Sequence, residues 1–97
     1  MTYALRPTAD AEIDEIFAHY SQASDHIAAD FIDRLLNELQ AIGSHPGRCG
    51  WIDDHFRRCR MRKYPYLIAY APTQTPVLIV AIYHAARRPD YWRSRVQ

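Results

Sequence analysis

Side chains suited to phosphate chemistry gather near the end of the chain. His84 can act as base or acid, because histidine changes charge near neutral pH. Arg87 and Arg88 can bind a phosphate through charge-assisted hydrogen bonds, and Tyr91 can stack on a base or donate a proton. Cleavage of RNA by its own 2′-hydroxyl needs a base, cations at the phosphate and an acid for the leaving oxygen. These residue types therefore suit phosphodiester chemistry.

A second group of arginines lies upstream, in the alternating segment Phe56–Tyr64. Arg58, Arg60 and Arg62 are two residues apart and fall on one face of a strand, whereas Cys59 and Met61 fall on the other. The three arginines could bind the same phosphate, or they could form part of a protein interface.

An interface needs no catalytic group, and arginine and aromatic residues dominate interface hot spots. The residues that we expect at a target-binding surface are Trp51, Arg58, Arg60, Arg62, Arg87 and Trp92. Purely structural roles stay open for some of these positions. His84 closes a predicted strand and could only hydrogen-bond the next turn, whereas Tyr91 and Trp92 could anchor the tail on the core.

Two cysteines follow two histidines at the same spacing, in His45-x3-Cys49 and His55-x3-Cys59. Four such ligands could form a tetrahedral zinc site, but zinc ligand pairs are usually more tightly spaced. In the predicted strand Cys59 points into the core with its neighbour Met61. We therefore expect no bound metal and no cofactor, and cysteines that stay unpaired in a reducing compartment.

Length and composition favour one soluble domain over residues 1–97, with 48% hydrophobic and 24% charged residues. No apolar run has the length of a membrane span, and the first residues do not resemble a signal peptide. We expect a cytoplasmic protein that does not bind membranes.

Charge is distributed unevenly, although the net charge is only +1. Residues 1–47 hold two basic and eight acidic residues, whereas residues 48–97 hold ten basic and three acidic residues. Such asymmetry indicates that the second half meets an anionic partner. An equally good explanation is that the two halves neutralise each other across the fold.

Two amphipathic helices should precede the strands. Thr2–Arg6 predicts a short strand that Pro7 stops, and Thr8 is a candidate N-cap for a first helix to about Tyr20. Ser24 is a second candidate cap, for a helix that Gly43 should end. Their helically spaced apolar stripes are Ala9, Ile13, Ile16, Phe17 and Tyr20, then Ile27, Ala28, Phe31, Ile32, Leu35, Leu36, Leu39 and Ile42.

Three strands should follow, at Phe56–Tyr64, Tyr66–Ala71 and Val77–Tyr83, with a short tail helix at Asp90–Arg95. Because the Pro72–Pro76 loop is too short for a crossover, the last two strands should be antiparallel. The expected fold is α+β: a short N-terminal strand and a helical hairpin packed on one face of an antiparallel β-sheet. The other face would carry the arginines.

Several segments, in order, resemble the RelE/ParE toxin superfamily. Residues 57–70, RRCRMRKYPYLIAY, resemble its arginine-rich strand and the motif that follows, and residues 77–92 resemble its last strand, His-x-x-Arg turn and terminal Pro-x-x-Trp. Residues 5–16 and 29–36 are similar to its two helices. The resemblance covers nearly the whole chain and implies a growth-arresting toxin of a type II toxin–antitoxin system.

This superfamily contains two activities. RelE-type members cut mRNA in the ribosomal A site, whereas ParE-type members inhibit DNA gyrase and serve in plasmid stabilisation. The motifs at residues 64–68, 84–87 and 89–92 look closer to ParE, and only one lysine, Lys63, is present where RelE-type nucleases use several. The resemblance therefore implies a non-enzymatic gyrase inhibitor.

Two other functions stay open. One is a ribosome-dependent mRNA endoribonuclease with His84, Arg87 and Tyr91 as catalytic residues. The other is an inactive member that only binds antitoxin. All three imply a cognate antitoxin protein as partner in a hetero-oligomer.

Overall fold

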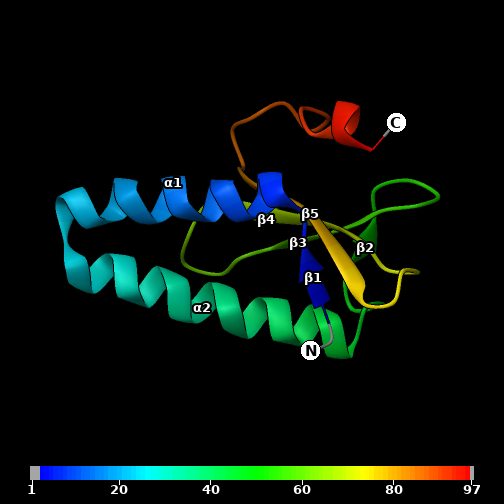
Figure 1. Cartoon of the computed structure of the whole chain (residues 1–97), viewed down its shortest axis with the longest axis horizontal. Helices are drawn as coiled ribbons and strands as arrows, with labels where there is room; N and C mark the ends of the chain where they lie inside the picture. The colour runs from blue at the N-terminus through cyan, green and yellow to red at the C-terminus, as the bar shows by residue number, and fades with distance from the viewer. Residues whose placement is uncertain (1–2, 97) are drawn as a thin grey trace.

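The computed structural model describes residues 3–96 and shows two helices beside a five-stranded sheet (Figure 1). The elements, in chain order, are β1 (Tyr3–Leu5), α1 (Pro7–Ala23), α2 (Asp25–Ser44), β2 (Gly50–Trp51), β3 (Arg57–Arg60), β4 (Tyr66–Ala71), β5 (Val77–His84) and a 3₁₀ helix (Arg93–Arg95). The strand order is β1-β5-β4-β3-β2, so the last strand in sequence lies inside the sheet. The predicted α+β class is confirmed.

The helix boundaries differ from the prediction at three of four ends, one of them the end of α1 at Ala23 rather than near Tyr20. α1 begins at Pro7 rather than after Thr8, because proline has no N–H to leave unpaired in a first turn. α2 begins as predicted, where the Ser24 hydroxyl accepts the Ile27 N–H at 3.3 Å. It continues through Gly43 to Ser44. The next residue, His45, precedes Pro46, and helical geometry is disfavoured for a residue directly before proline, so the helix ends there. Neither helix within residues 3–96 has the length and apolarity to cross a bilayer.

The sheet is mixed rather than purely antiparallel. β3, β4 and β5 pair antiparallel, as predicted, whereas β1 pairs parallel to β5 through Tyr3↔Val77, Ala4↔Leu78 and Leu5↔Ile79. The parallel pairing is possible because the long segment between β1 and β5, including the helical hairpin, provides the crossover. The part of the expected first strand at Thr2 lies outside the described residues.

One predicted strand is shorter than expected, and one strand was not predicted. β3 covers only Arg57–Arg60, because the chain turns at residues 61–65 and Lys63 adopts a positive φ of 68°. Arg62 therefore lies in the turn and not in the row formed by Arg58 and Arg60. The strand missed by sequence reasoning is β2, which has two residues and pairs with β3 at the edge of the sheet.

Asp30 of α2 holds the β3–β4 turn in place. Its carboxylate accepts hydrogen bonds from the Tyr64 hydroxyl at 2.7 Å, the Lys63 ammonium at 2.9 Å and the Arg34 guanidinium at 3.0 Å. The hydrogen bond from Lys63, with the other two donors, holds the pKa of Asp30 well below its usual range. Burial, helped by the adjacent carboxylate, raises the pKa of Tyr64 to about 12.

The helices cover one face of the sheet, which we call the inner face. Its core includes Phe31, Leu35, Leu39 and Ile42 from α2 and Ile68, Tyr70, Ile79 and Ile82 from the sheet. The opposite, outer face is partly covered by residues 91–96. Trp92 packs there on Ala69, Val80, Ala81 and Tyr83. The outer face therefore has its own small apolar core beside the arginines.

The cysteines form a disulfide, which contradicts the expectation of unpaired thiols. Cys49 and Cys59 are bonded with their Cα atoms 5.3 Å apart. Because Gly50 pairs with Arg58, the cysteines occupy the next opposed positions of the same ladder. Cys59 is 1% exposed, so its predicted inward direction is confirmed. A Glu38 carboxylate oxygen lies within 4.8 Å of both sulfurs, but bonded sulfurs offer no thiolate to a metal.

Candidate functional site

Two rows of side chains cross the outer face from β3 through β4 to β5. The strand registers place them as Arg58–Ala69–Ala81 and Arg60–Leu67–Tyr83. Both arginines are exposed, and no carboxylate among residues 3–96 lies within 4 Å of either guanidinium. Ala69 and Ala81 are fully buried beneath the tail, so the accessible side chains of these rows are Arg58, Arg60 and the half-buried Leu67. Two exposed arginines without carboxylate partners in the described part of the chain suit a protein or nucleic-acid contact.

Trp51 lies at the edge of this sheet rather than among the arginine rows. It pairs with Arg57, whose side chain points to the opposite face from Arg58, and the Arg57 guanidinium lies 4.0 Å from the centre of the Trp51 ring. Its side chain is 51% exposed. Trp51 is therefore accessible to a partner, but only to one that reaches around the β2 edge.

Trp92 is completely buried, so a partner cannot contact it in this conformation. Its ring packs edge-on against Phe56 with the centroids 5.1 Å apart. The next residue, Arg93, forms an ion pair with Asp53, which also caps the turn before β3 by accepting the Phe56 N–H. This geometry matches the alternative role of Trp92 as the anchor of the tail.

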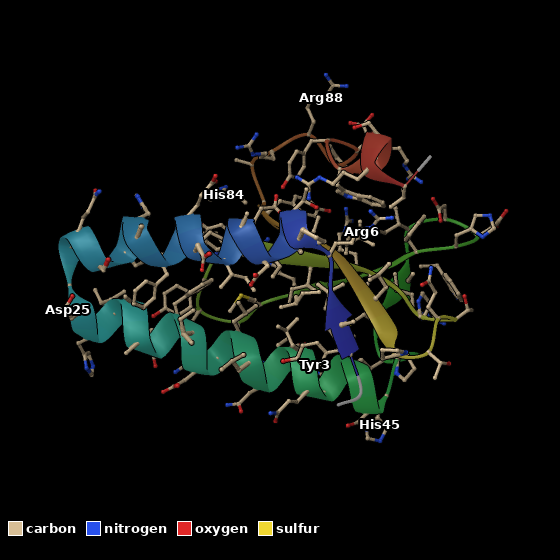
Figure 2. The ribbon with its side chains drawn as sticks, viewed as in Figure 1. Tyr3, Arg6, Asp25, His45, His84 and Arg88 are labelled. Atoms are coloured by element: carbon tan, nitrogen blue, oxygen red, sulfur yellow. A yellow bond between two sulfur atoms is a disulfide. The ribbon has the colours of Figure 1, made fainter. Side chains whose placement is uncertain are left out.

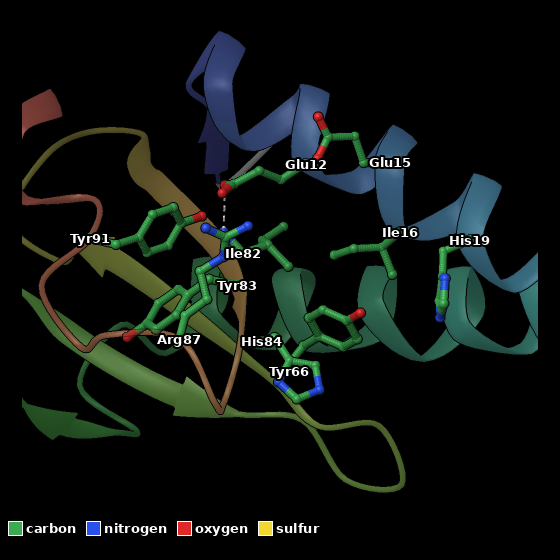
Figure 3. Close-up of a pocket in the computed structure, with 10 residues that line it drawn as sticks. All are labelled: Glu12, Glu15, Ile16, His19, Tyr66, Ile82, Tyr83, His84, Arg87 and Tyr91. Carbon is green, nitrogen blue, oxygen red and sulfur yellow. Dashed lines mark hydrogen bonds between the residues drawn. The ribbon is translucent and has the colours of Figure 1, made fainter.

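His84, Arg87 and Tyr91 line one pocket of about 200 Å³ at the end of β5 (Figure 3). Its other lining residues come from α1, β4 and β5: Glu12, Glu15, Ile16, His19, Tyr66, Ile82 and Tyr83. The cavity is smaller than the roughly 300–1,000 Å³ typical of small-molecule sites. Glu12 is paired with Arg95, whereas the exposed Glu15 brings a negative charge beside the positive Arg87.

His84 is turned toward the helical side of the sheet. It stands opposite Tyr66 in the β4–β5 ladder, and the two rings meet edge-on at 5.4 Å. Its Nδ1 atom accepts the Ala86 N–H at 3.0 Å, so one ring nitrogen already serves the turn. Because alternate residues of a strand point to opposite faces, His84 and the rows of Arg58 and Arg60 lie on opposite sides of the sheet.

Arg87 and Arg88 differ in their surroundings. The Arg87 guanidinium lies 4.9 Å from the centre of the Tyr91 ring, which in turn packs on Tyr83 at 5.3 Å. Arg88 is exposed at the top of the view in Figure 2, where its Nε atom lies 3.5 Å from the Asp90 carboxylate. Arg87 is therefore held against Tyr91, whereas Arg88 takes no part in this contact.

Sequence reasoning missed the contact that closes the pocket on one side. The Glu12 carboxylate accepts the Ile82 N–H at 3.0 Å and forms two hydrogen bonds with Arg95, each 3.1 Å (Figure 3 shows the first). Arg95 also donates to the Val80 carbonyl at 3.3 Å. Glu12 and Arg95 therefore provide hydrogen-bond partners for backbone groups of β5 that lie beyond the end of β1. They are 83 residues apart, so no local sequence signal links them.

The uneven charge of the sequence persists in space. Exposed acidic residues lie on the helices at Asp10, Asp14, Glu15, Asp25 and Asp33, and exposed basic residues lie on the sheet and its turns at Arg58, Arg60, Arg62, Arg87 and Arg88. Some of the charges neutralise each other, as in the Glu12–Arg95, Asp30–Lys63 and Glu38–Arg48 pairs. Mutual neutralisation therefore accounts for part of the asymmetry, and the anionic partner stays a prediction.

Comparisons with known proteins agree with this architecture. Residues 3–89 match the family described as ParE toxin of type II toxin–antitoxin system, parDE. Toxin ParE2 of Mycobacterium tuberculosis, in strains CDC 1551 and H37Rv, is 31% identical over 97 residues, which cover 93% of this chain and 89% of that protein. A chain of the chromosomal ParDE system from P. aeruginosa superposes with a TM-score of 0.75 at 15% identity, covering 87% of this chain and 95% of that one. The family match and the similarity to ParE2 show that this chain belongs to the ParE toxins of type II toxin–antitoxin systems.

Proposed function

We propose that this ParE-family toxin arrests growth by binding DNA gyrase and blocking its supercoiling activity. The observation that carries the proposal is the outer face, where Arg58 and Arg60 lie exposed beside the half-buried Leu67 without carboxylate partners among residues 3–96. Inhibition by binding needs only such a surface, and arginines with aromatic neighbours are typical of interface hot spots. The exposed Trp51 could add a contact at the edge.

The arrangement of the remaining residues supports binding over nuclease activity. A ribonuclease would need His84 beside the arginines that hold the phosphate, but Arg58 and Arg60 lie on the other face of the sheet. The pocket that does contain His84 also contains the exposed Glu15, whose carboxylate repels phosphate.

One observation favours the alternative, a ribosome-dependent mRNA endoribonuclease. His84, Arg87 and Tyr91 do line a common pocket, and His84 keeps Nε2 for proton transfer. This alternative predicts codon-dependent mRNA cuts that His84→Ala slows by roughly 10²-fold or more, the usual contribution of a general acid or base.

The partner that neutralises the toxin should be a cognate antitoxin, bound as a hetero-oligomer in the cytoplasm. An extended or helical acidic segment would complement Arg58 and Arg60, and it would occupy the surface proposed for gyrase. The antitoxin should therefore compete with gyrase and restore supercoiling. If induced expression is harmless without antitoxin, the chain is instead an inactive antitoxin-binding member.

Two assays on one preparation test the proposal: supercoiling of relaxed plasmid by gyrase, and cleavage of mRNA in a translating extract. The wild-type toxin should block the first and leave mRNA uncut. Arg58→Ala with Arg60→Ala should weaken inhibition about tenfold or more, and added salt should weaken wild-type inhibition. Arg34→Ala, which removes an exposed cation from α2, is the matched control and should have little effect.

His84→Ala separates the two activities in the same assays. Gyrase inhibition should survive this change, because the side chain points away from the arginine rows. Cuts in mRNA that disappear with His84→Ala, together with unaffected gyrase, would assign the chain to the RelE activity.

A further inference from the structure

The disulfide is attached directly to the strand that carries the two exposed arginines. Cys59 lies between Arg58 and Arg60 in β3, and its sulfur is bonded to Cys49, the residue just before β2. Because Gly50 pairs with Arg58, the disulfide adds one covalent link to a ladder of only two residue pairs. The β2 edge thus depends on the Cys49–Cys59 bond more than on regular strand pairing.

Two further sets of contacts hold the β2 edge: the Ile52 N–H donates to the Phe56 carbonyl at 2.8 Å just after β2, and Arg57 contributes its side chain. The Arg57 guanidinium donates to the Gly47 carbonyl at 3.2 Å and to the Cys49 carbonyl, and it lies against Trp51. Gly50 and Trp51 are both exposed. A strand this short with little buried surface opens easily when its restraint is removed.

We propose that Cys49 and Cys59 form a thiol–disulfide switch that fixes the β2 edge when oxidised and releases it when reduced, with the oxidised form binding the target more tightly. This inference rests on the proposed function, since it concerns regulation of the same surface. Loss of β2 makes β3 an open edge strand, so the positions of Arg58 and Arg60 become less fixed. Ordering them again on binding then costs affinity.

The reductant would be a small dithiol or a dithiol protein. Cys49 is the more accessible sulfur, because Cys59 is buried. A thiolate of the reductant attacks Sγ of Cys49, and Sγ of Cys59 leaves with the electron pair and takes up a proton. The second thiolate of the reductant then attacks the reductant sulfur that is bonded to Cys49. Cys49 leaves with the electron pair and takes up a proton to become a thiol. The reductant ends as a disulfide, and the protein has gained two electrons and two protons.

Hydrogen–deuterium exchange of the free full-length chain tests the switch without any target. After reduction by dithiothreitol, with two free thiols per chain confirmed by titration, peptides covering residues 45–52 should exchange about tenfold faster or more. Peptides covering β5 should stay strongly protected, which shows that the reduced chain has not unfolded globally. The double variant Cys49→Ser with Cys59→Ser should show the fast exchange with and without dithiothreitol.

Gyrase binding by the same samples tests the consequence. Reduction should weaken binding about threefold or more for the wild type and should not affect the double variant. Unchanged exchange at residues 45–52, or faster exchange with unchanged gyrase affinity, would overturn the switch. If neither redox form binds gyrase, the gyrase proposal fails. Cognate antitoxin then replaces gyrase as the binding probe for the switch. An affinity for antitoxin that does not change on reduction would overturn the switch.

Discussion

The carboxylate of Glu12 and the guanidinium of Arg95 form a two-bond ion pair that joins α1 to the C-terminal 3₁₀ helix. The same two side chains hydrogen-bond the backbone of Ile82 and Val80 on the edge of β5. The pairing of β1 with β5 ends at Ile79, so Glu12 and Arg95 provide the hydrogen bonds that a neighbouring strand would otherwise make with Val80 and Ile82. It also sets the position of the tail that bears Tyr91.

Glu12→Ala should lower the free energy of unfolding by about 2 kcal/mol, because it leaves the partly buried Arg95 and the Ile82 N–H without their acceptor. Urea denaturation measures this change. Glu15→Ala, which removes an exposed carboxylate from the same helix, is the control. An equal effect of the two variants would contradict the role assigned to the pair.

Two buried tyrosines provide a matched test of hydrogen bonding. The Tyr70 hydroxyl donates to the Pro46 carbonyl at 2.7 Å, whereas the Tyr83 hydroxyl is buried without a partner among residues 3–96. Tyr70→Phe should therefore cost about 1–2 kcal/mol of unfolding free energy, and Tyr83→Phe should be neutral or slightly stabilising. Thermal or urea unfolding of both variants decides the point, and similar losses would contradict it.

Acid should destabilise the fold partly through Asp30. Its pKa is lowered in the folded state, first by Lys63 and then by Tyr64 and Arg34. Its contribution to stability is therefore present above the unfolded pKa, about 4, and is lost as the pH falls toward the lower folded pKa. Urea midpoints between pH 5 and 2 should fall less steeply for Asp30→Asn than for the wild type. Asp33→Asn controls for the loss of a carboxylate from α2, and equal slopes for Asp30→Asn and wild type would contradict this prediction.

Reduction of the Cys49–Cys59 disulfide should also lower global stability. The bond closes a loop with a sequence separation of 10 residues, for which chain entropy predicts about 2–3 kcal/mol. The melting temperature should fall by on the order of 10 °C in dithiothreitol. The double serine variant should not respond to dithiothreitol. A wild-type melting temperature that is independent of reductant would contradict the prediction.

Sequence periodicity predicted the elements that have clear local signals. The strand Tyr66–Ala71 was predicted with its observed ends, because prolines at positions 65 and 72 bracket an apolar run. Ser24 marked the start of α2, because its hydroxyl caps the first turn. Such signals are contained in a few neighbouring residues, which is why a single sequence reveals them.

The missed features depend on distant residues. The two residues of β2 have no period of their own, and the disulfide beside them joins positions 10 residues apart. The alternation that produced the arginine row continues past the end of β3, so it could not show that Arg62 lies in a turn. Alternation could, however, have placed His84 on the face opposite Arg58, had the strand pairing been known.

The inner place of β5 in the sheet has a consequence for synthesis on the ribosome. A nascent chain that ends before Val77 can form the helical hairpin, but it lacks the strand that joins β1 to β4. The apolar stripes of both helices then stay uncovered, and long-range pairing must wait until the last strand emerges. Translation that stalls before this strand would therefore yield a fragment without the assembled arginine surface. If the arginine surface acts as proposed, the toxin cannot act before residues 77–84 have left the ribosome.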